Sequence, residues 1–523
     1  MFWNRNLRIG SFRDARLIGS VCIASWLLFL AYVARLRDVT HDAFHEMALV
    51  RAFFATGSFP YDDIFAFTPT VTPTVHHEWG TGLILYWIAG ISPLGLHGMA
   101  VIRVLMIALL GLVLYRVARN NGAHPLWIGL AAIVAFPIGW VGFATLRAQL
   151  FTLLFLSLQI LLQQSDWRGE KRWGLLWWCM LVIWLNLHAG FVVGVSMLGL
   201  HMLERWVVFL KERRWRFDSF SFLSAFWHHA VLILVIPPSL CLNPWGADYP
   251  GYLWHALLMS RPTMAEWQPL WKTYQPGLAM ASFAALVITL GYVLRYRRWD
   301  RLRGWLFCLL AAYMALKHIR HGSLFAVVWV ALAPGWLSPT PFGRRVLTWI
   351  QLHRQGVVLV AWGASLAAIC FTIHHPVWRI ELPNSDPKSG MVYPVGAVNY
   401  LKKSGFSGNV MTPFSAGAYL TWECYPQIRV SLDGRYEVAY RADVLPKHDL
   451  FYAAKPGWRS VLDEYHADAI LVKQSAPVRS LLGSVDYATE HFRLVYEDEV
   501  FALFVEESLS VGAAVAPATS LKR

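Results

Sequence analysis

Residues 41–79, HDAFHEMALVRAFFATGSFPYDDIFAFTPTVTPTVHHEW, form the longest polar interval in the first 200 residues of the chain. One apolar segment precedes this interval, at about residues 17–33, and the segment that returns the chain across the membrane follows it, at residues 99–115. Histidines and carboxylates gather here although only 15% of the chain is charged. Because charged side chains near a membrane are costly and mark functional sites, we expect the chemistry of the protein to start in this interval.

The composition predicts a polytopic membrane protein. The 523 residues are 56% hydrophobic, and apolar runs recur over the first 373 residues with arginine-rich breaks between them. The net charge of +14 lies in short clusters at the ends of these runs. Such clusters are typical of topology signals and anionic-lipid contacts, so nucleic acid is not an expected partner. No CxxC motif occurs among the six cysteines, which argues against a disulfide framework.

The positive-inside rule orders the apolar runs. Arg5, Arg8, Arg13 and Arg16 place the N-terminus in the cytoplasm, and the first run is expected to stay as a span because no small-residue cleavage site follows it. The short run at 81–91 is expected to lie in the outer interface. Eleven spans are expected, at residues 17–33, 99–115, 125–143, 148–162, 173–187, 192–210, 222–242, 278–294, 305–316, 324–337 and 357–373.

The sequence therefore predicts an α-helical polytopic domain over residues 1–373, with an outer loop at 35–98 that carries juxtamembrane helices. Residues 374–507 have mixed charge and turn signals, and they predict an external α/β domain. Its expected helices lie at 395–403 and 458–465, and its expected strands lie at 409–413, 428–432 and 469–472, with a hairpin at 492–505. Residues 508–523 are small and of low complexity, so we expect a disordered tail.

Polar residues in apolar context indicate where a site lies. The alternation of spans places all of them at outer ends or in outer loops, while the inner half of the bundle is expected to be almost free of them. They are Asp42, Glu46, Glu78, Arg147, Asn186, His188, Asn243, Glu266, Lys317, His318, Arg320 and His321. A functional cavity at the outer face is the prediction.

The cationic residues predict a phosphate site. Lys317, His318, Arg320 and His321 cluster on the side where topology needs no positive charge, so an anion is their expected partner. Arg147 either joins this donor-phosphate site or extends to the interface from a helix end. For Asn186 and His188, a cavity role and hydrogen bonding between helices are both open.

The carboxylates predict a general base. Asp42 is the expected catalytic residue and Glu78 the second candidate, while His45, His77, Asn243 and Glu266 are expected to line the acceptor cavity. A carboxylate base together with cations at a departing phosphate describes glycosyl transfer from a polyprenyl-phosphate sugar. Metal-compatible ligands are also offered by His76 and His77 beside Glu78, together with His41, Asp42 and His45. Their spacing matches no fixed motif, so the presence of a divalent metal stays open.

On these residues the sequence resembles the GT-C superfamily of integral membrane glycosyltransferases, with a likeness to bacterial protein mannosyltransferases, aminoarabinose transferases and rhizobial galacturonosyltransferases. HDAFHE at 41–46 and HHEW at 76–79 carry the resemblance, with the order of first span, outer loop and juxtamembrane helix. The resemblance implies Asp42 as the acid that follows the first span. It also implies a polyprenyl-phosphate-linked sugar donor, a lipid, glycan or protein acceptor, and a bacterial inner membrane with the C-terminal domain outside.

Two alternatives stay open. An oligosaccharide ligase or polymerase would use the same donor without a carboxylate base, and a lipid or polysaccharide transporter would need polar residues through both leaflets. The segment DGRYE at 433–437 either contacts the acceptor or forms a structural turn with an Asp433–Arg435 pair. The sequence does not identify the sugar or the acceptor.

Overall fold

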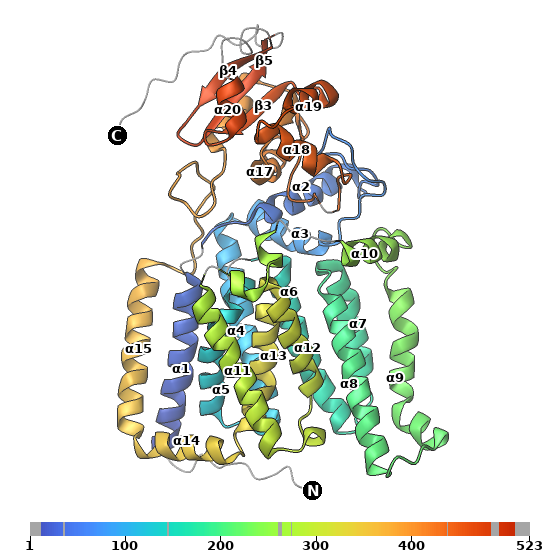
Figure 1. Cartoon of the computed structure of the whole chain (residues 1–523), viewed down its shortest axis with the longest axis vertical. Helices are drawn as coiled ribbons and strands as arrows, with labels where there is room; N and C mark the ends of the chain where they lie inside the picture. The colour runs from blue at the N-terminus through green and yellow to red at the C-terminus, as the bar shows by residue number, and fades with distance from the viewer. Residues whose placement is uncertain are drawn as a thin grey trace. The chain divides into compact units, whose positions relative to one another are not determined.

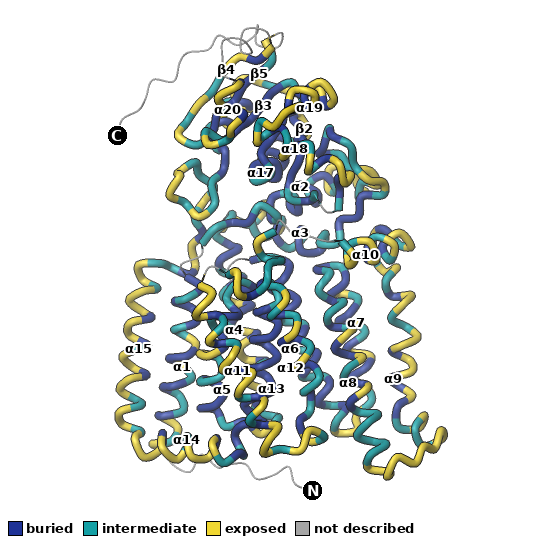
Figure 2. Tube along the Cα trace, viewed as in Figure 1, coloured by how far each residue is buried: buried dark blue, intermediate teal, exposed yellow. Residues whose placement is uncertain are grey.

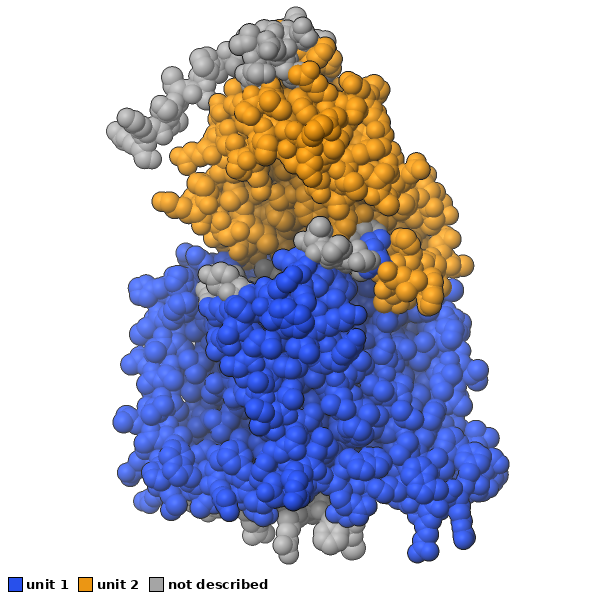
Figure 3. Space-filling model, viewed as in Figure 1, with its two compact units in different colours: residues 1–37, 97–242, 259–379 blue, residues 38–96, 243–258, 380–523 orange. Residues whose placement is uncertain are grey.

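The computed structural model describes residues 12–34, 37–143, 146–259, 264–273, 275–436, 438–482 and 491–507. These residues form two compact units, shown in different colours in Figure 3. Unit 1 comprises residues 1–37, 97–242 and 259–379, and unit 2 comprises residues 38–96, 243–258 and 380–523. The expected disordered tail at 508–523 lies outside the described residues.

Unit 1 is a helical bundle (Figure 1). Its helices are α1 (Phe12–Ala34), α4 (His97–Asn120), α5 (Pro125–Gly139), α6 (Ala148–Trp167), α7 (Trp173–Leu187), α8 (Phe191–Glu212), α9 (Ser219–Ser239), α11 (Pro276–Tyr296), α12 (Trp305–Lys317), α13 (Gly322–Leu337), α14 (Pro341–Leu352) and α15 (Arg354–His374). Short 3₁₀ turns connect them, including η3 (Ala265–Trp267), η5 (Trp299–Arg301) and η6 (Ile319–His321).

The chain is a multi-span membrane protein, as predicted. Each of the eleven expected spans coincides with a helix, and eight of the described helices are long and apolar enough to cross a membrane. A ninth crossing is possible if α13 and α14, which meet at a bend of 89°, count as one span. The number eleven is not confirmed, because α7 and α12 have only 15 and 13 residues. At about 1.5 Å per residue, such helices are shorter than the roughly 30 Å of hydrocarbon.

Helix α13 lies at the centre of unit 1. All of its residues are buried, which fits a helix that is apolar on every side (Figure 2). It packs against α4, α5 and α12. A Cβ on Gly322 would lie 2.5 Å from the carbonyl oxygen of Ile138, so the approach of α13 to α5 requires glycine at this position.

Unit 2 contains a five-stranded sheet with strand order β2-β1-β3-β5-β4. The strands are β1 (Gly408–Met411), β2 (Ile428–Val430), β3 (Ala469–Lys473), β4 (Phe492–Glu497) and β5 (Phe501–Glu506). β1 is parallel to β2 and β3, and β5 is antiparallel to β3 and β4. The helices are α16 (Val395–Ser404), α17 (Phe414–Cys424), α18 (Val444–Tyr452), α19 (Trp458–Tyr465) and α20 (Pro477–Leu482). The predicted α/β architecture is confirmed, although α17, α18 and α20 were not predicted.

The polar interval of the sequence belongs to unit 2. It forms α2 (His41–Thr56) and α3 (Trp79–Leu85), and α10 (Asp248–Leu258) joins the same unit. Val430 N donates to Phe65 O at 2.9 Å and Phe67 N donates to Val430 O at 3.2 Å, so the interval adds an extended segment beside β2. An exposed strand edge accepts such an addition because its backbone groups are otherwise unpaired. Unit 2 therefore combines the polar interval with the C-terminal residues, which differs from the contiguous division at residue 373.

Candidate functional site

The first turn of α2 carries Asp42, and His45 follows three residues later on the same face of the helix. A Cβ on Gly434 would lie 3.3 Å from Asp42 Oδ1 and 3.6 Å from His45 Nδ1, so both side chains face the turn at 433–435. A carboxylate in the first turn of a helix also lies near the positive end of the helix dipole. The interval and the C-terminal segment of unit 2 therefore meet at Asp42.

His45 provides a neutral neighbour for this carboxylate. Burial lowers the pKa of His45, and the negative charges of Asp433 and Asp42 offset this only in part. Its Nδ1 atom is buried without a hydrogen-bond partner. At neutral pH the imidazole is therefore uncharged.

A buried ion triad lies at the same turn. Arg435 Nε contacts both carboxylate oxygens of Asp433 at 3.0 Å, and Arg435 Nη1 binds Asp63. Asp63 Oδ1 also accepts the backbone N–H groups of Phe65 at 2.9 Å and Ala66 at 2.7 Å. Burial alone would raise the pKa of Asp63, but Arg435, His76 and the N–H group of Ala66 lower it overall. The structural interpretation of the Asp433–Arg435 pair thus describes the observed contacts, and Asp63 is a third member that the sequence analysis missed.

Glu78 and the adjacent histidines lie at the start of α3. Glu78 is the N-cap residue of that helix, and its Oε1 is 3.3 Å from His77 Nε2. His77 Nδ1 is hydrogen-bonded to the hydroxyl of Tyr252 on α10 at 2.8 Å. His76 is buried, which lowers its pKa to about 3, and the charge of Arg435 contributes in the same direction. Glu78 therefore orients His77, which itself holds α10.

In unit 1 the predicted phosphate-binding residues gather around Glu266. Its two carboxylate oxygens lie 3.3 Å from Arg147 Nη1 and 3.4 Å from Arg320 Nη1. Arg320 also stacks over the ring of Trp267, with 4.7 Å between the guanidinium carbon and the ring centroid. His318 Nδ1 is hydrogen-bonded to the carbonyl oxygen of Trp267 at 2.7 Å. Arg147, His318 and Arg320 thus converge on η3, which positions two guanidinium groups around one anion.

The remaining predicted site residues lie as follows. Lys317 is the exposed last residue of α12, and His321 ends η6 with its Nδ1 buried and without a hydrogen-bond partner. His188 Nδ1 is 2.7 Å from Thr152 Oγ1, and Asn186 donates to the carbonyl oxygens of Val182 and Leu242. Those two sets of contacts match the alternative interpretation, in which Asn186 and His188 bond between helices. Asn243 accepts a hydrogen bond from the backbone of Trp245 at 2.9 Å, as in a turn.

No family model and no curated protein matches this chain, but solved structures do. ArnT from Cupriavidus metallidurans bound to undecaprenyl phosphate superimposes with a TM-score of 0.53 at 12% identity, over 95% of this chain and 98% of that one. The archaeal oligosaccharyltransferase AglB from Archaeoglobus fulgidus, in complex with an inhibitory peptide and a dolichol-phosphate, superimposes with a TM-score of 0.53 at 13% identity, over 86% and 69%. Both are GT-C membrane glycosyltransferases. The chain has the GT-C fold.

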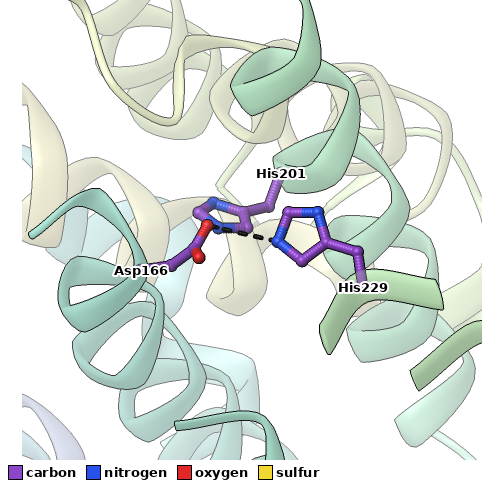
Figure 4. A group of neighbouring side chains, drawn as sticks. All are labelled: Asp166, His201 and His229. Atoms are coloured by element: carbon purple, nitrogen blue, oxygen red, sulfur yellow. Dashed lines mark hydrogen bonds and ion pairs between the residues drawn. The ribbon is translucent and has the colours of Figure 1, made fainter. Parts of the chain in front are cut away.

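The GT-C bundle of unit 1 holds a second polar cluster that the sequence analysis missed (Figure 4). Asp166 on α6, drawn in Figure 4 with His201 and His229, accepts a hydrogen bond from His201 Nε2 on α8 at 2.8 Å. It accepts another from His228 Nε2 on α9, also at 2.8 Å. Arg205 Nε, Trp173 Nε1 and His229 Nε2 lie 2.9, 3.2 and 3.3 Å from the same carboxylate. Asp166 lies near the end of α6 that the predicted topology assigns to the inner half of the bundle. The expectation that the inner half is almost free of polar residues is therefore wrong. The dipeptide His228–His229 inside an apolar run was the signal available in the sequence.

The spacing of the side chains in this cluster raises the question of a metal ion. Among the described residues, Asp166, His201 and His229 are the group whose ligand atoms all lie within 4.8 Å of one another. Trp206 Nε1 donates to His229 Nδ1 at 3.1 Å, so the proton of a neutral His229 is on Nε2 and points to Asp166. A metal on Nε2 would need the proton on Nδ1, where it would oppose the indole N–H. The contacts thus fit a hydrogen-bonded carboxylate and do not fit a metal.

Proposed function

We propose that the chain is a glycosyltransferase that moves a sugar from a polyprenyl-phosphate donor to a lipid, glycan or protein acceptor, at the outer face of a bacterial inner membrane. The observation that carries the proposal is the Asp42 carboxylate beside the buried, neutral His45. The GT-C fold supports it, because ArnT was solved with undecaprenyl phosphate and AglB with a dolichol-phosphate. A polyprenyl phosphate is therefore a lipid that both of those proteins hold.

Asp42 is the proposed general base. It accepts the proton of the acceptor hydroxyl as that oxygen forms a bond to the anomeric carbon of the sugar. The bond from this carbon to the phosphate oxygen breaks, and the polyprenyl phosphate leaves with one additional negative charge. A positioned base of this kind contributes about 10² to 10⁴ in rate. Glu78 is the second candidate, and its contact with His77 favours an orienting role.

The departing phosphate needs cations, and we assign it to Arg147 and Arg320 with Lys317, His318 and His321. Glu266 now lies between the two arginines, at the position that a phosphate oxygen would take. Paired guanidinium groups match phosphate geometry and stabilise developing charge. Unit 1 also contains an apolar cavity of about 490 Å³, lined by residues that include Trp26, Phe29 and Phe143. An isoprenoid chain fits the chemistry of this lining.

The test uses a readout that is independent of the sugar. Purified protein in lipid nanodiscs is mixed with a membrane lipid extract that contains polyprenyl-phosphate sugars, and the free polyprenyl phosphate produced is measured by mass spectrometry. Donor binding is measured in the same nanodiscs as the amount of intact polyprenyl-phosphate sugar that the protein retains, and Arg320→Ala should weaken it about 10- to 150-fold, the loss expected for one charged hydrogen bond. Lys272→Ala, which removes an exposed cation from the neighbouring turn, is the matched control. Unchanged donor affinity in Arg320→Ala would remove the phosphate assignment.

Two alternatives remain, and the same assay separates them. A ligase or polymerase would use the same donor and release polyprenyl phosphate without needing Asp42. A transporter would consume no donor at all, and the buried polar residues around Asp166 are of the kind that a polar path through the bundle would need. If correctly folded protein consumes no donor, that result would favour the transporter alternative.

A further inference from the structure

A second basic site lies in unit 1, at the end of the bundle where α1 begins. A cavity of about 490 Å³ there is lined by the charged residues Arg205, Arg297, Arg301, Arg303, Glu212 and Asp300. A neighbouring cavity of about 570 Å³ shares Arg297 and adds Arg119 and Arg344. Neither cavity contains any residue that the proposed transfer reaction uses.

The arginines of the first cavity outnumber its two acidic residues, Glu212 and Asp300. Asp300 is engaged by Lys211 and Arg298, each at 3.0 Å. Arg297 Nε is buried without a hydrogen-bond partner. Burial lowers the pKa of Arg297, and the nearby charge of Arg301 lowers it further. Like charges held together in a partly buried space favour an anion as their common partner.

The cavity wall is preorganised. Asp166 accepts from Arg205 Nε at 2.9 Å, and this carboxylate is itself fixed by three histidines. Arg205 and Arg303 both stack over Trp167, with guanidinium carbons 4.6 and 4.7 Å from the ring centroid. Burial lowers the pKa of Arg303, and so does the charge of Arg205. Two guanidinium groups held in fixed orientation suit the oxygens of a phosphate better than a mobile cation would.

Helix α14 connects this site to the lipid surface. It is bent by 89° from α13 and exposes Phe342, Trp349 and Leu352, while Arg344 lines the second cavity. Such a helix lies in the membrane interface, with its apolar face among the acyl chains. Basic pockets between transmembrane helices bind anionic headgroups. We propose that the two cavities bind the phosphate of an anionic phospholipid, with Arg297, Arg301 and Arg303 as the principal donors.

The test measures lipid retention by the full chain in a neutral detergent. Native mass spectrometry after titration with phosphatidylglycerol should show a bound lipid, and phosphatidylcholine should not compete for it. Arg301→Gln should lower the affinity for phosphatidylglycerol about tenfold or more. Arg116→Gln is the matched control, because Arg116 is exposed on α4 and lines neither cavity. Equal retention of both lipids, or equal affinity in Arg301→Gln and the wild type, would overturn the proposal.

Two further experiments test whether the bound phosphate belongs to a lipid and whether its recognition needs a guanidinium group. Inorganic phosphate at millimolar concentration should leave the phosphatidylglycerol bound. Displacement of the phosphatidylglycerol by inorganic phosphate would overturn the assignment to a lipid. Arg301→Lys keeps the charge that topology requires but lacks the planar fork, so it should still lose affinity severalfold. Full affinity in the lysine variant would mean that only net charge matters there, and the phosphate site would be rejected.

Discussion

Arg435 joins two distant segments of unit 2 through a single guanidinium group. Arg435→Ala would leave the carboxylates of Asp63 and Asp433 buried without their cation, since all three side chains are at most 1% exposed. Removing one partner of a buried ion pair typically costs about 3 to 5 kcal/mol. We therefore expect a large loss of protection of the β1 and β2 peptides in hydrogen exchange of the full chain.

Lys447→Ala is the control for this prediction. Lys447 bridges Asp443 at 3.0 Å and Glu464 at 2.6 Å at the surface, where water screens the interaction. Its loss should change the exchange pattern little. If both variants lose the same protection, the buried triad is not what holds the turn at 433–435.

His76 gives unit 2 a defined dependence on pH. Its pKa is about 3 in the folded protein, against an ordinary value of 6.5, because the ring is buried. The unfolded chain therefore binds a proton that the folded chain excludes. The free energy of unfolding should fall as the pH drops below 6.5, by up to about 1.4 kcal/mol per pH unit.

The window from pH 6.5 to about 4.5 lies above the ordinary range of the carboxylates, and burial lowers the pKa of His45 and His448 as well, so these three histidines of unit 2 contribute together. Thermal unfolding of the full chain across this window should show the decrease, and His76→Gln should reduce the slope. A slope that is the same in His76→Gln and the wild type would assign the pH dependence to other groups, of which His45 is the nearest candidate.

Among the elements, α17 illustrates how tightly unit 2 is packed. A Cβ on Gly417 would lie 2.0 Å from the carbonyl oxygen of Leu432, one residue before Asp433. Gly417→Ala must therefore push the helix away from this segment, at a typical cost of about 1 to 3 kcal/mol. Chemical denaturation of the full chain would measure the loss. Gly363→Ala on α15 meets nothing within 4 Å, so it should be neutral.

The elements that the sequence predicted share a physical cause. Apolar runs of about 20 residues have few alternatives to a spanning helix, and β-branched runs between turn residues gave the strands of the sheet. α14 was not predicted, because its 12 residues alternate between basic and apolar faces and no run stands out. The residues of α2 were assigned to the outer loop at 35–98 for a similar reason. Their histidines and carboxylates interrupt the apolar pattern of the helix face that is buried within unit 2.

The site residues also divide into those that stand out in the local sequence and those whose partners lie far away along the chain. Asp42 and the cluster at 317–321 were predicted as site residues because their polar types stand out locally. Asp63 was missed, because its partner Arg435 lies far away in the sequence and only the folded chain brings them together. Asp166 was missed because a carboxylate at the end of a span looks like a flanking charge, until three histidines from α8 and α9 are seen to surround it.

For the whole molecule, the number of crossings determines which loops share a side. Reporters fused after Arg172 and after Pro250 are separated by α7, α8 and α9, so they should report opposite sides if α7 crosses. Reporters after Arg298 and after Arg345 are separated by α12 and α13, so they should report the same side if α12 crosses. We expect the cytoplasm at Arg172, Arg298 and Arg345. A signal from the same side at Arg172 and Pro250 would remove α7 from the spans.

The central claim is that Asp42 is the base of a glycosyl transfer, and the turnover of Asp42→Asn tests it most directly. Asparagine keeps the size and most hydrogen bonding of aspartate but cannot accept the proton. The rate of polyprenyl phosphate release should therefore fall by about 10² to 10⁴, while donor binding and expression persist. Glu78→Gln, the paired control, should lose less. Full activity in Asp42→Asn with an inactive Glu78→Gln would move the base to Glu78, and full activity in both variants would contradict the carboxylate mechanism.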